Sequence, residues 1–117
     1  MMREIAELHA RALPHTASSK RGVGYLEKLY FIVAKMGYVK ITMRDKKIVG
    51  VVSGIGPLIL TLVVDPEWQR RGIGRELLGE LEGQRVVYTE ECTTGFYEKI
   101  GFRKIIRLGK VIFLWRK

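Results

Sequence analysis

The residues with the clearest chemical potential lie in one short basic segment, Gln69-Arg70-Arg71-Gly72-Ile73-Gly74-Arg75. An apolar run ending at Val64 and an Asp65-Pro66 turn precede it, and an amphipathic helix follows it. The first N–H groups of a helix have no partner within the helix and carry partial positive charge. Glycines let an anion approach the main chain closely, and arginines add positive charge beside it. The segment therefore predicts a binding site for phosphate groups.

Two helices are expected before any strand. In the first, Ile5 and Leu8 fall on one apolar face, and Pro14 ends the helix. The polar stretch from His15 to Gly22 reads as a loop. The second helix follows apolar residues at helical spacing up to Met36, after which Gly37 supplies a C-terminal stop.

The remainder of the chain predicts a mixed sheet. Three antiparallel strands come first, and the helix after the basic segment leads to a strand that pairs in parallel, because a strand, a helix and a strand favour a right-handed crossover. A short helix and a final hairpin complete the order ααβββαβαββ, an α/β fold with a mixed α+β sheet in one domain over residues 1–117. The expected elements are strands Tyr38–Met43, Ile48–Ser53 and Leu58–Val64, helix Gly72–Glu82, strand Arg85–Thr89, a helix from Thr93 or Thr94 to before Gly101, and strands Phe102–Leu108 and Val111–Trp115.

Two common nucleotide loops fit the basic segment poorly. A P-loop requires Gly-x-x-x-x-Gly-Lys-Ser/Thr, which is absent. A Rossmann fingerprint requires a third glycine, where this chain has Leu77, although Glu90 lies about where a ribose-binding acid belongs. Seven residues separate Val64 from Gly72, too many for the tight strand-to-helix turn of that fold. A different phosphate-containing ligand is therefore favoured.

Two sequence blocks resemble the GNAT superfamily of N-acetyltransferases. Gln69–Gly74 matches the pattern Gln/Arg-x-x-Gly-x-Gly/Ala, the acetyl-CoA signature of that family. Phe96-Tyr97-Glu98-Lys99-Ile100-Gly101-Phe102 resembles a later block of the family, and the resemblance extends from about Ile5 to Trp115. It implies a GNAT-like acyl-CoA N-acyltransferase fold and transfer of acetyl from acetyl-CoA to a primary amine. The alternative is a CoA-binding regulatory module of the same fold without turnover.

The resemblance also implies where CoA would bind. The strand matching Leu58–Val64 would separate from the next one, and its main chain would hold the pantetheine arm. An N–H group near Val64 would face the thioester oxygen, and the following loop would hold the pyrophosphate. The implied CoA-binding residues are Leu62, Val63, Val64, Gln69, Arg70, Arg71, Gly72, Ile73, Gly74 and Arg75.

By the same resemblance, Tyr97 would be the general acid that protonates the departing thiolate. A phenol with a pKa of about 10 stays protonated at neutral pH and can donate to a thiolate whose acid has a pKa of about 8.5. The strand Leu58–Val64 contains no acid, so Glu90 and Glu91 are the candidates for a base acting through water. His15 is a more remote candidate for the base.

Composition limits the other possibilities. The net charge is +9, with ten Lys/Arg against four acids in residues 1–58 and eleven against eight in residues 59–117. This surface suits anionic ligands, but no Lys/Arg run exceeds two residues, so nucleic acid is an unlikely partner. Lys20 and Arg21, in the loop expected between the helices, would suit an acceptor with a negative group. A single cysteine, Cys92, and two histidines make no recognisable metal set.

The N-terminus leads to two further expectations. No apolar run approaches the length that spans a bilayer, and the acidic start does not resemble a signal peptide, so a cytoplasmic protein that does not enter the membrane is expected. GNAT proteins usually begin with a strand, whereas this chain begins in a helix. An open sheet edge would follow, and we expect either a homodimer formed through that edge or a first strand replaced from elsewhere.

Overall fold

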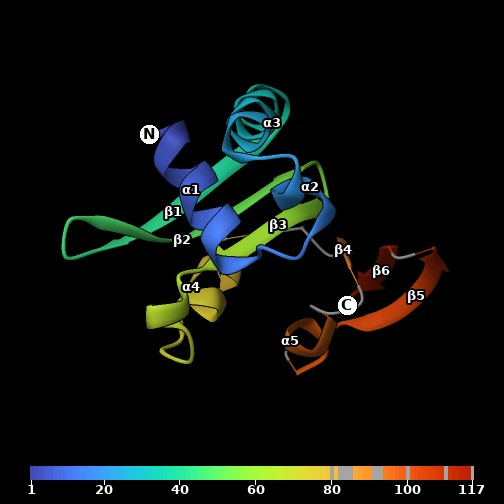
Figure 1. Cartoon of the computed structure of the whole chain (residues 1–117). Helices are drawn as coiled ribbons and strands as arrows, with labels where there is room; N and C mark the ends of the chain where they lie inside the picture. The colour runs from blue at the N-terminus through green and yellow to red at the C-terminus, as the bar shows by residue number, and fades with distance from the viewer. Residues whose placement is uncertain (80, 82–85, 91–93, 100, 110, 117) are drawn as a thin grey trace.

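Helices cover both faces of a central sheet in the computed structural model (Figure 1). The structure describes residues 1–79, 81, 86–90, 94–99, 101–109 and 111–116, without the side chains of residues 88–90, 94, 96 and 111. Within these residues no helix combines the length and the apolar character that a membrane span requires.

Three N-terminal helices lie together on one side of the sheet (Figure 1). They are α1 (Met2–Ala12), α2 (Ala17–Lys20) and α3 (Val23–Met36). Helix α1 packs against α3 and against the strands beneath it. Helix α2 corrects the prediction of a loop between the two longer helices. It is a single turn, closed where Lys20 N–H donates to Thr16 O at 3.1 Å, and one turn is too short to show an apolar periodicity.

Six described strands form the sheet, in the spatial order β1-β2-β3-β4-β6-β5. Strands β3 and β4 are parallel, as predicted from the crossover, and the other neighbours are antiparallel. The observed order is αααβββαβαββ with a 3-10 turn before the fourth α-helix, so the predicted order lacked α2 and this turn. The bounds are β1 Tyr38–Arg44, β2 Lys47–Ile55, β3 Leu58–Val64, η1 Pro66–Trp68, α4 Ile73–Gly79, β4 Val86–Glu90, α5 Thr94–Lys99, β5 Arg103–Leu108 and β6 Val111–Trp115.

The predicted ends of the helices and strands agree with the observed ends within a few residues wherever the structure describes them. The predicted bounds of β3 are those observed. The predicted end of the α4 helix at Glu82, the predicted strand start at Arg85, and Cys92 lie outside the described residues. Strands β1 and β5 form the two edges of the described sheet, and the expected homodimer remains a prediction.

The sheet separates two apolar clusters. One lies on the side of α4 and α5, and the other lies under α1 and α3. The first contains Val49, Val52, Ile59, Ile73, Leu77, Leu78, Val87, Tyr97, Phe102, Ile112 and Leu114. The second contains Ile5, Leu8, Tyr30, Ile48, Val51 and Val63. These two buried clusters fix α4 and α1 on opposite faces of β3.

His9 of α1 is a titratable group within the core, and only 3% of it is exposed. Burial lowers the pKa of His9 from 6.5 to about 4, so the unfolded chain binds a proton more readily than the folded one. The free energy of unfolding is therefore not reduced by His9 above pH 6.5. It decreases as the pH falls from 6.5 toward 4, because the unfolded chain then binds a proton that the folded protein does not bind.

We expect the free energy of unfolding to decrease by an amount on the order of 3 kcal/mol over this pH range. Urea unfolding of the wild type and of His9→Asn, measured at intervals between pH 7 and pH 4, checks this expectation. The His9→Asn variant should show a flatter dependence on pH than the wild type. Equal slopes for His9→Asn and the wild type would contradict the assignment.

Candidate active site

Strands β3 and β4 pair over only two positions and then part. The ladder joins Leu58 to Val86 and Ile59 to Val87, yet β3 continues to Val64 and β4 to Glu90. Directly after the last pair, the register of β3 against β2 shifts by one residue at Leu60. Such a bulge bends its strand and ends regular pairing. The bulge therefore lies where β3 loses its parallel neighbour.

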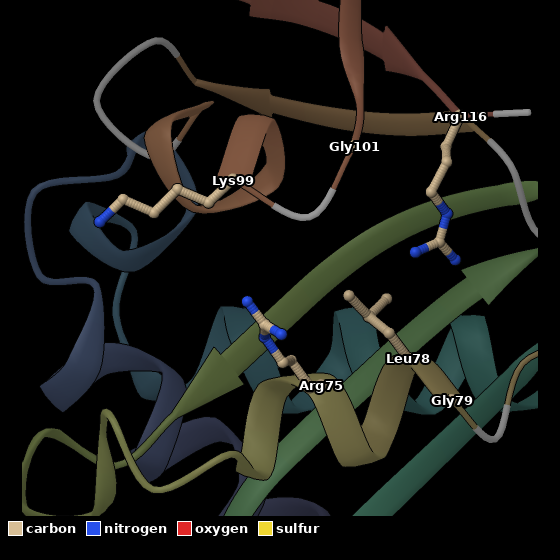
Figure 2. Close-up of a pocket in the computed structure, with 6 residues that line it drawn as sticks. All are labelled: Arg75, Leu78, Gly79, Lys99, Gly101 and Arg116. Atoms are coloured by element: carbon tan, nitrogen blue, oxygen red, sulfur yellow. The ribbon is translucent and has the colours of Figure 1, made fainter.

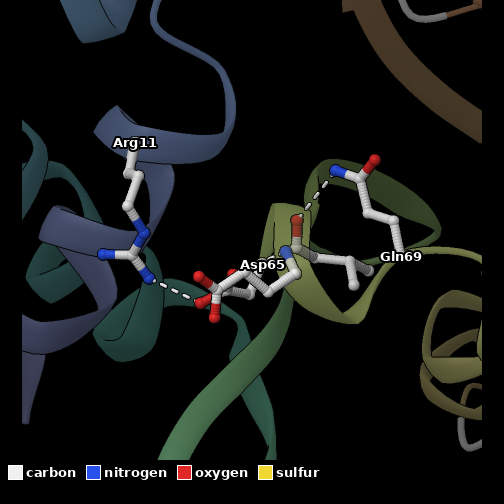
Figure 3. Close-up of polar contacts among 5 residues, drawn as sticks. Arg11, Asp65 and Gln69 are labelled. Carbon is white, nitrogen blue, oxygen red and sulfur yellow. Dashed lines mark hydrogen bonds and ion pairs between the residues drawn. The ribbon is translucent and has the colours of Figure 1, made fainter.

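The main chain of β3 presents hydrogen-bonding groups on the side that β4 has left. The N–H group of Asp65 donates to Val49 O of β2 at 2.8 Å. Because the direction of these groups alternates along a strand, Val63 also faces β2, whereas Leu62 and Val64 face away from it. In agreement, Val64 O accepts a hydrogen bond from Gln69 Nε2 at 3.1 Å (Figure 3). Of the three residues expected to hold pantetheine through the main chain, Leu62 and Val64 have the required orientation.

The loop between β3 and α4 is built on the carboxylate of Asp65. This side chain accepts hydrogen bonds from Glu67 N–H at 3.0 Å and from Arg11 of α1 at 2.7 Å (Figure 3). Burial alone would raise the pKa of Asp65, but these two donors hold it below its usual value. The ionised carboxylate thus fixes the turn from which the basic segment begins.

Unpaired N–H groups follow this turn. Within the described residues, none of the main-chain N–H groups from Gln69 to Arg75 donates to a main-chain carbonyl, and the first helical bond runs from Glu76 N–H to Gly72 O at 2.9 Å. Arg70 and Gly72 have positive φ angles of 65° and 83°. Backbone of this kind turns successive N–H groups toward a common point, which is how proteins bind anions without side chains.

A basic pocket of about 530 Å³ lies between α4 and the C-terminal part of the chain (Figure 2). Its volume is within the range of ligand pockets. Figure 2 shows Arg75 rising from α4 and Arg116 pointing down from the end of β6. The lining residues that the structure describes are Arg75, Leu78, Gly79, Lys99, Gly101 and Arg116, which include three cations and no acid.

The sequence identified part of this basic lining. Arg75 was predicted, whereas Lys99 and Arg116 were not. Lys99 belongs to the second sequence block, which could have indicated it, but nothing near Arg116 in the sequence does so. Of the other predicted arginines, Arg70 is exposed, and Arg71 places its guanidinium 4.8 Å from the centre of the Trp68 ring.

Tyr97 lies in the core near the point where β3 and β4 part. It is 4% exposed and shares a cluster with Ile59 and Val87, the last pair of the parallel ladder. Its ring packs edge-on against Phe102, with centroids 5.6 Å apart. Burial, together with the nearby Tyr30 phenol, raises the pKa of Tyr97 above its usual value, so the phenol stays protonated at neutral pH.

The base candidates are not brought into this site by any described contact. The side chain of Glu90 and the whole of Glu91 lie outside the described residues. His15 is exposed in the turn before α2, and Lys20 and Arg21 follow on the α1 and α3 side. Among the described residues, no group of three His, Cys, Asp or Glu side chains comes together as a metal site would require.

The parting of β3 and β4 beside a loop of unpaired N–H groups agrees with the arrangement that the resemblance to the GNAT superfamily implies. Residues 27–104 match the family model described as "Acetyltransferase (GNAT) domain". The chain therefore belongs to the GNAT family of acetyltransferases. The sequence matches none of the curated proteins with which it was compared.

Solved structures agree in fold. PH1933 from Pyrococcus horikoshii superposes with a TM-score of 0.80 at 20% identity, covering 99% of this chain and 89% of the other. The PaiA N-acetyltransferase of Thermoplasma acidophilum, solved in complex with coenzyme A, gives 0.76 at 18% identity, covering 99% and 92%. The ribosomal-protein-S18-alanine N-acetyltransferase of Escherichia coli gives 0.66 at 16% identity, covering 98% and 86%. At these identities the likeness is one of fold.

Proposed function

We propose that this protein is an acetyl-CoA-dependent N-acetyltransferase that transfers an acetyl group directly to a primary amine. The observation that carries the proposal is the early end of the β3–β4 ladder beside the loop of unpaired N–H groups. An extended pantetheine arm could pair with Leu62 and Val64, whose main-chain groups face away from β2. The pyrophosphate would then reach the N–H groups of residues 69–75 and the basic pocket.

In the proposed reaction the amine nitrogen attacks the thioester carbon. The C–N bond forms and the C–S bond breaks, while an N–H group of β3 near Val64 stabilises the charge that develops on the carbonyl oxygen. The thiolate of CoA takes the phenolic proton of Tyr97, and the resulting phenolate regains a proton from water before the next turnover. The proton lost by the amine passes to water, for which Glu90 and Glu91 remain the candidate bases.

Two measurements test the proposal in sequence. Thermal unfolding with CoA, acetyl-CoA, NAD and an oligonucleotide shows which ligand binds the folded state, because such a ligand raises the melting temperature. We expect a shift with both forms of CoA and not with NAD. Thiol release from acetyl-CoA is then followed with n-butylamine, spermidine and peptides bearing a free N-terminal alanine or an internal lysine. No shift with either form of CoA would overturn the proposal.

A CoA-binding protein without turnover is the second candidate. It is favoured by one observation: β3, which reads Leu-Ile-Leu-Thr-Leu-Val-Val, offers no carboxylate or imidazole as a base. A shift in melting temperature with CoA, combined with no thiol release for any amine, would select this function.

The three cations of the pocket predict a defined loss of CoA affinity. In the variant Arg75→Gln/Lys99→Gln, two positive charges beside the proposed phosphate site are removed. We expect the Kd for CoA, measured by calorimetry, to rise about tenfold, which corresponds to about 1.4 kcal/mol. The matched control Lys28→Gln/Lys40→Gln removes two exposed charges that do not line the pocket. Equal affinities of the two double variants would exclude the pocket as part of the CoA site.

A further inference from the structure

Four polar side chains form a hydrogen-bonded chain through the core beneath α1 and α3. The His9 Nδ1 atom lies 2.7 Å from Tyr30 Oη. The Tyr30 hydroxyl donates to Thr61 Oγ1 at 3.2 Å, and Thr61 Oγ1 lies 2.5 Å from Ser53 Oγ. The four residues come from α1, α3, β3 and β2, so the chain joins elements that are distant in sequence.

The hydrogen-bonded chain of four side chains is surrounded by apolar residues. Ser53 is fully buried and Tyr30 is 1% exposed, within the cluster formed with residues such as Leu8 and Val63. Polar groups in such surroundings are stable only when they are hydrogen-bonded. Even so, His9 Nε2 has no partner among the described residues. Packing alone does not explain these polar side chains, because apolar residues could fill the same volume without leaving a nitrogen unpaired.

The direction of the hydrogen bonds follows from the single proton of Tyr30. Because this proton is donated to Thr61, the remaining contact requires His9 to donate from Nδ1 to Tyr30 Oη. Thr61 can then donate to Ser53 and still keep a lone pair. The low pKa of His9, about 4, keeps its ring uncharged at neutral pH, and burial raises the pKa of the Tyr30 phenol, which is therefore also uncharged. Within this hydrogen-bonded chain, the oxygen of the Thr61 hydroxyl can still accept one more hydrogen bond.

That hydroxyl lies beside the point where β3 and β4 part, one residue before Leu62, whose main chain faces away from β2. Thr61 follows the Leu60 bulge directly and comes two residues after Ile59, the last residue of β3 paired with β4. Thr61 is only partly buried, unlike Tyr30 and Ser53. Its side chain contacts the α3 side of the sheet, whereas the basic pocket lies on the α4 side. Opposite faces of β3 therefore carry a cationic pocket and a neutral hydroxyl.

We propose that Thr61 receives the acceptor amine, an inference that rests on the proposed N-acetyltransferase function. Its oxygen accepts a hydrogen bond from an N–H of the uncharged amine and so directs the nitrogen lone pair toward the thioester carbon. Tyr30 and His9 are positioning residues, which hold the Thr61 hydroxyl in one orientation through the hydrogen-bonded chain.

The test compares Thr61→Val with Thr61→Ser. It uses acetyl-CoA and whichever amine of the thiol-release assay reacts fastest with the wild type. Valine keeps the shape of threonine but cannot accept a hydrogen bond, whereas serine keeps the hydroxyl. We expect Thr61→Val to raise the KM for the amine and to lower kcat/KM about tenfold, with the Kd for CoA within twofold of the wild type. Thr61→Ser should retain most of the activity.

The positioning residues provide a second comparison, which also serves if Thr61→Val does not fold. Tyr30→Phe should lower kcat/KM for the amine several-fold. His9→Asn, whose amide can donate from near the position of Nδ1, should retain more activity than His9→Leu. A purely structural role would give losses that follow the melting temperatures of the variants, without the rise in KM.

The outcomes separate this inference from the proposed function. If the wild type acetylates no amine of the panel, the proposed function fails and the inference fails with it. If the wild type is active but Thr61→Val keeps the wild-type KM and kcat for the amine, only the role of Thr61 is overturned. Where Thr61→Val does not fold, the same result for Tyr30→Phe overturns it.

Discussion

Replacement of Tyr97 by phenylalanine is expected to lower kcat about 100-fold while changing the Kd for CoA less than twofold. General acids in enzymes contribute factors of about 10²–10⁴. Burial raises the pKa of Tyr97, so the phenol is protonated at neutral pH and donates a hydrogen bond to the departing thiolate; the same shift makes full proton transfer costlier, so transfer follows C–S cleavage. Phenylalanine keeps the ring and its edge-on packing against Phe102 but removes the proton. Steady-state kinetics and CoA calorimetry on the same preparation check both parts of this expectation.

A matched control separates chemistry from packing. Tyr25→Phe makes the same atomic change at a tyrosine that is 41% exposed on α3, and it should leave kcat unchanged. The melting temperature of Tyr97→Phe, measured on the same preparation, separates a loss of chemistry from a loss of stability. A Tyr97→Phe variant with wild-type kcat would remove Tyr97 from the mechanism and leave it as a packing residue.

Replacement of Gly54 by alanine is expected to destabilise the fold by about 3 kcal/mol or more. A methyl group at this position would collide with the main-chain oxygen of Leu58 and lie 2.5 Å from Tyr38 Oη. Gly54 pairs with Ile59 directly beside the β3 bulge, so relief of the collision must displace the strand that the proposed site uses. Urea unfolding should therefore show a large loss of stability, accompanied by weaker binding of CoA.

Gly24→Ala is the control for the loss of stability expected in Gly54→Ala. Gly24 lies in α3 with no atom within 4 Å of an added methyl group, and alanine favours a helix over glycine. This variant should be more stable than the wild type by up to about 1 kcal/mol. Equal effects of the two substitutions would show that the close contact at Gly54 does not constrain the sheet.

Local sequence features predicted much of the fold. The run from Leu58 to Val64, apolar except for Thr61, gave β3 with its observed bounds, because a strand covered on both faces is rich in apolar residues. The strand-helix-strand order gave the parallel pair, since that connection has one favoured hand. The segment from Gln69 to Arg75 also lies in the predicted place, at the turn from β3 to α4.

Features that depend on tertiary contacts were not predicted. Arg116 reaches the pocket from the end of β6, about forty residues after Arg75, and no local pattern links the two. The hydrogen bonds among His9, Tyr30 and Thr61 require three elements to pack together, so a histidine and a tyrosine in amphipathic helices gave no sign of them. Helix α2 was missed because one polar turn has no periodicity.

The contact between Arg11 and Asp65 has a consequence for the strength of substrate binding. Helix α1 carries both His9, which is joined to Thr61 through Tyr30, and Arg11, which holds the turn before the loop proposed to bind phosphate. A shift of α1 when one substrate binds would therefore alter the binding site of the other. Thermodynamic linkage makes such an effect reciprocal: whatever factor CoA applies to the affinity for the amine, the amine must apply to the affinity for CoA.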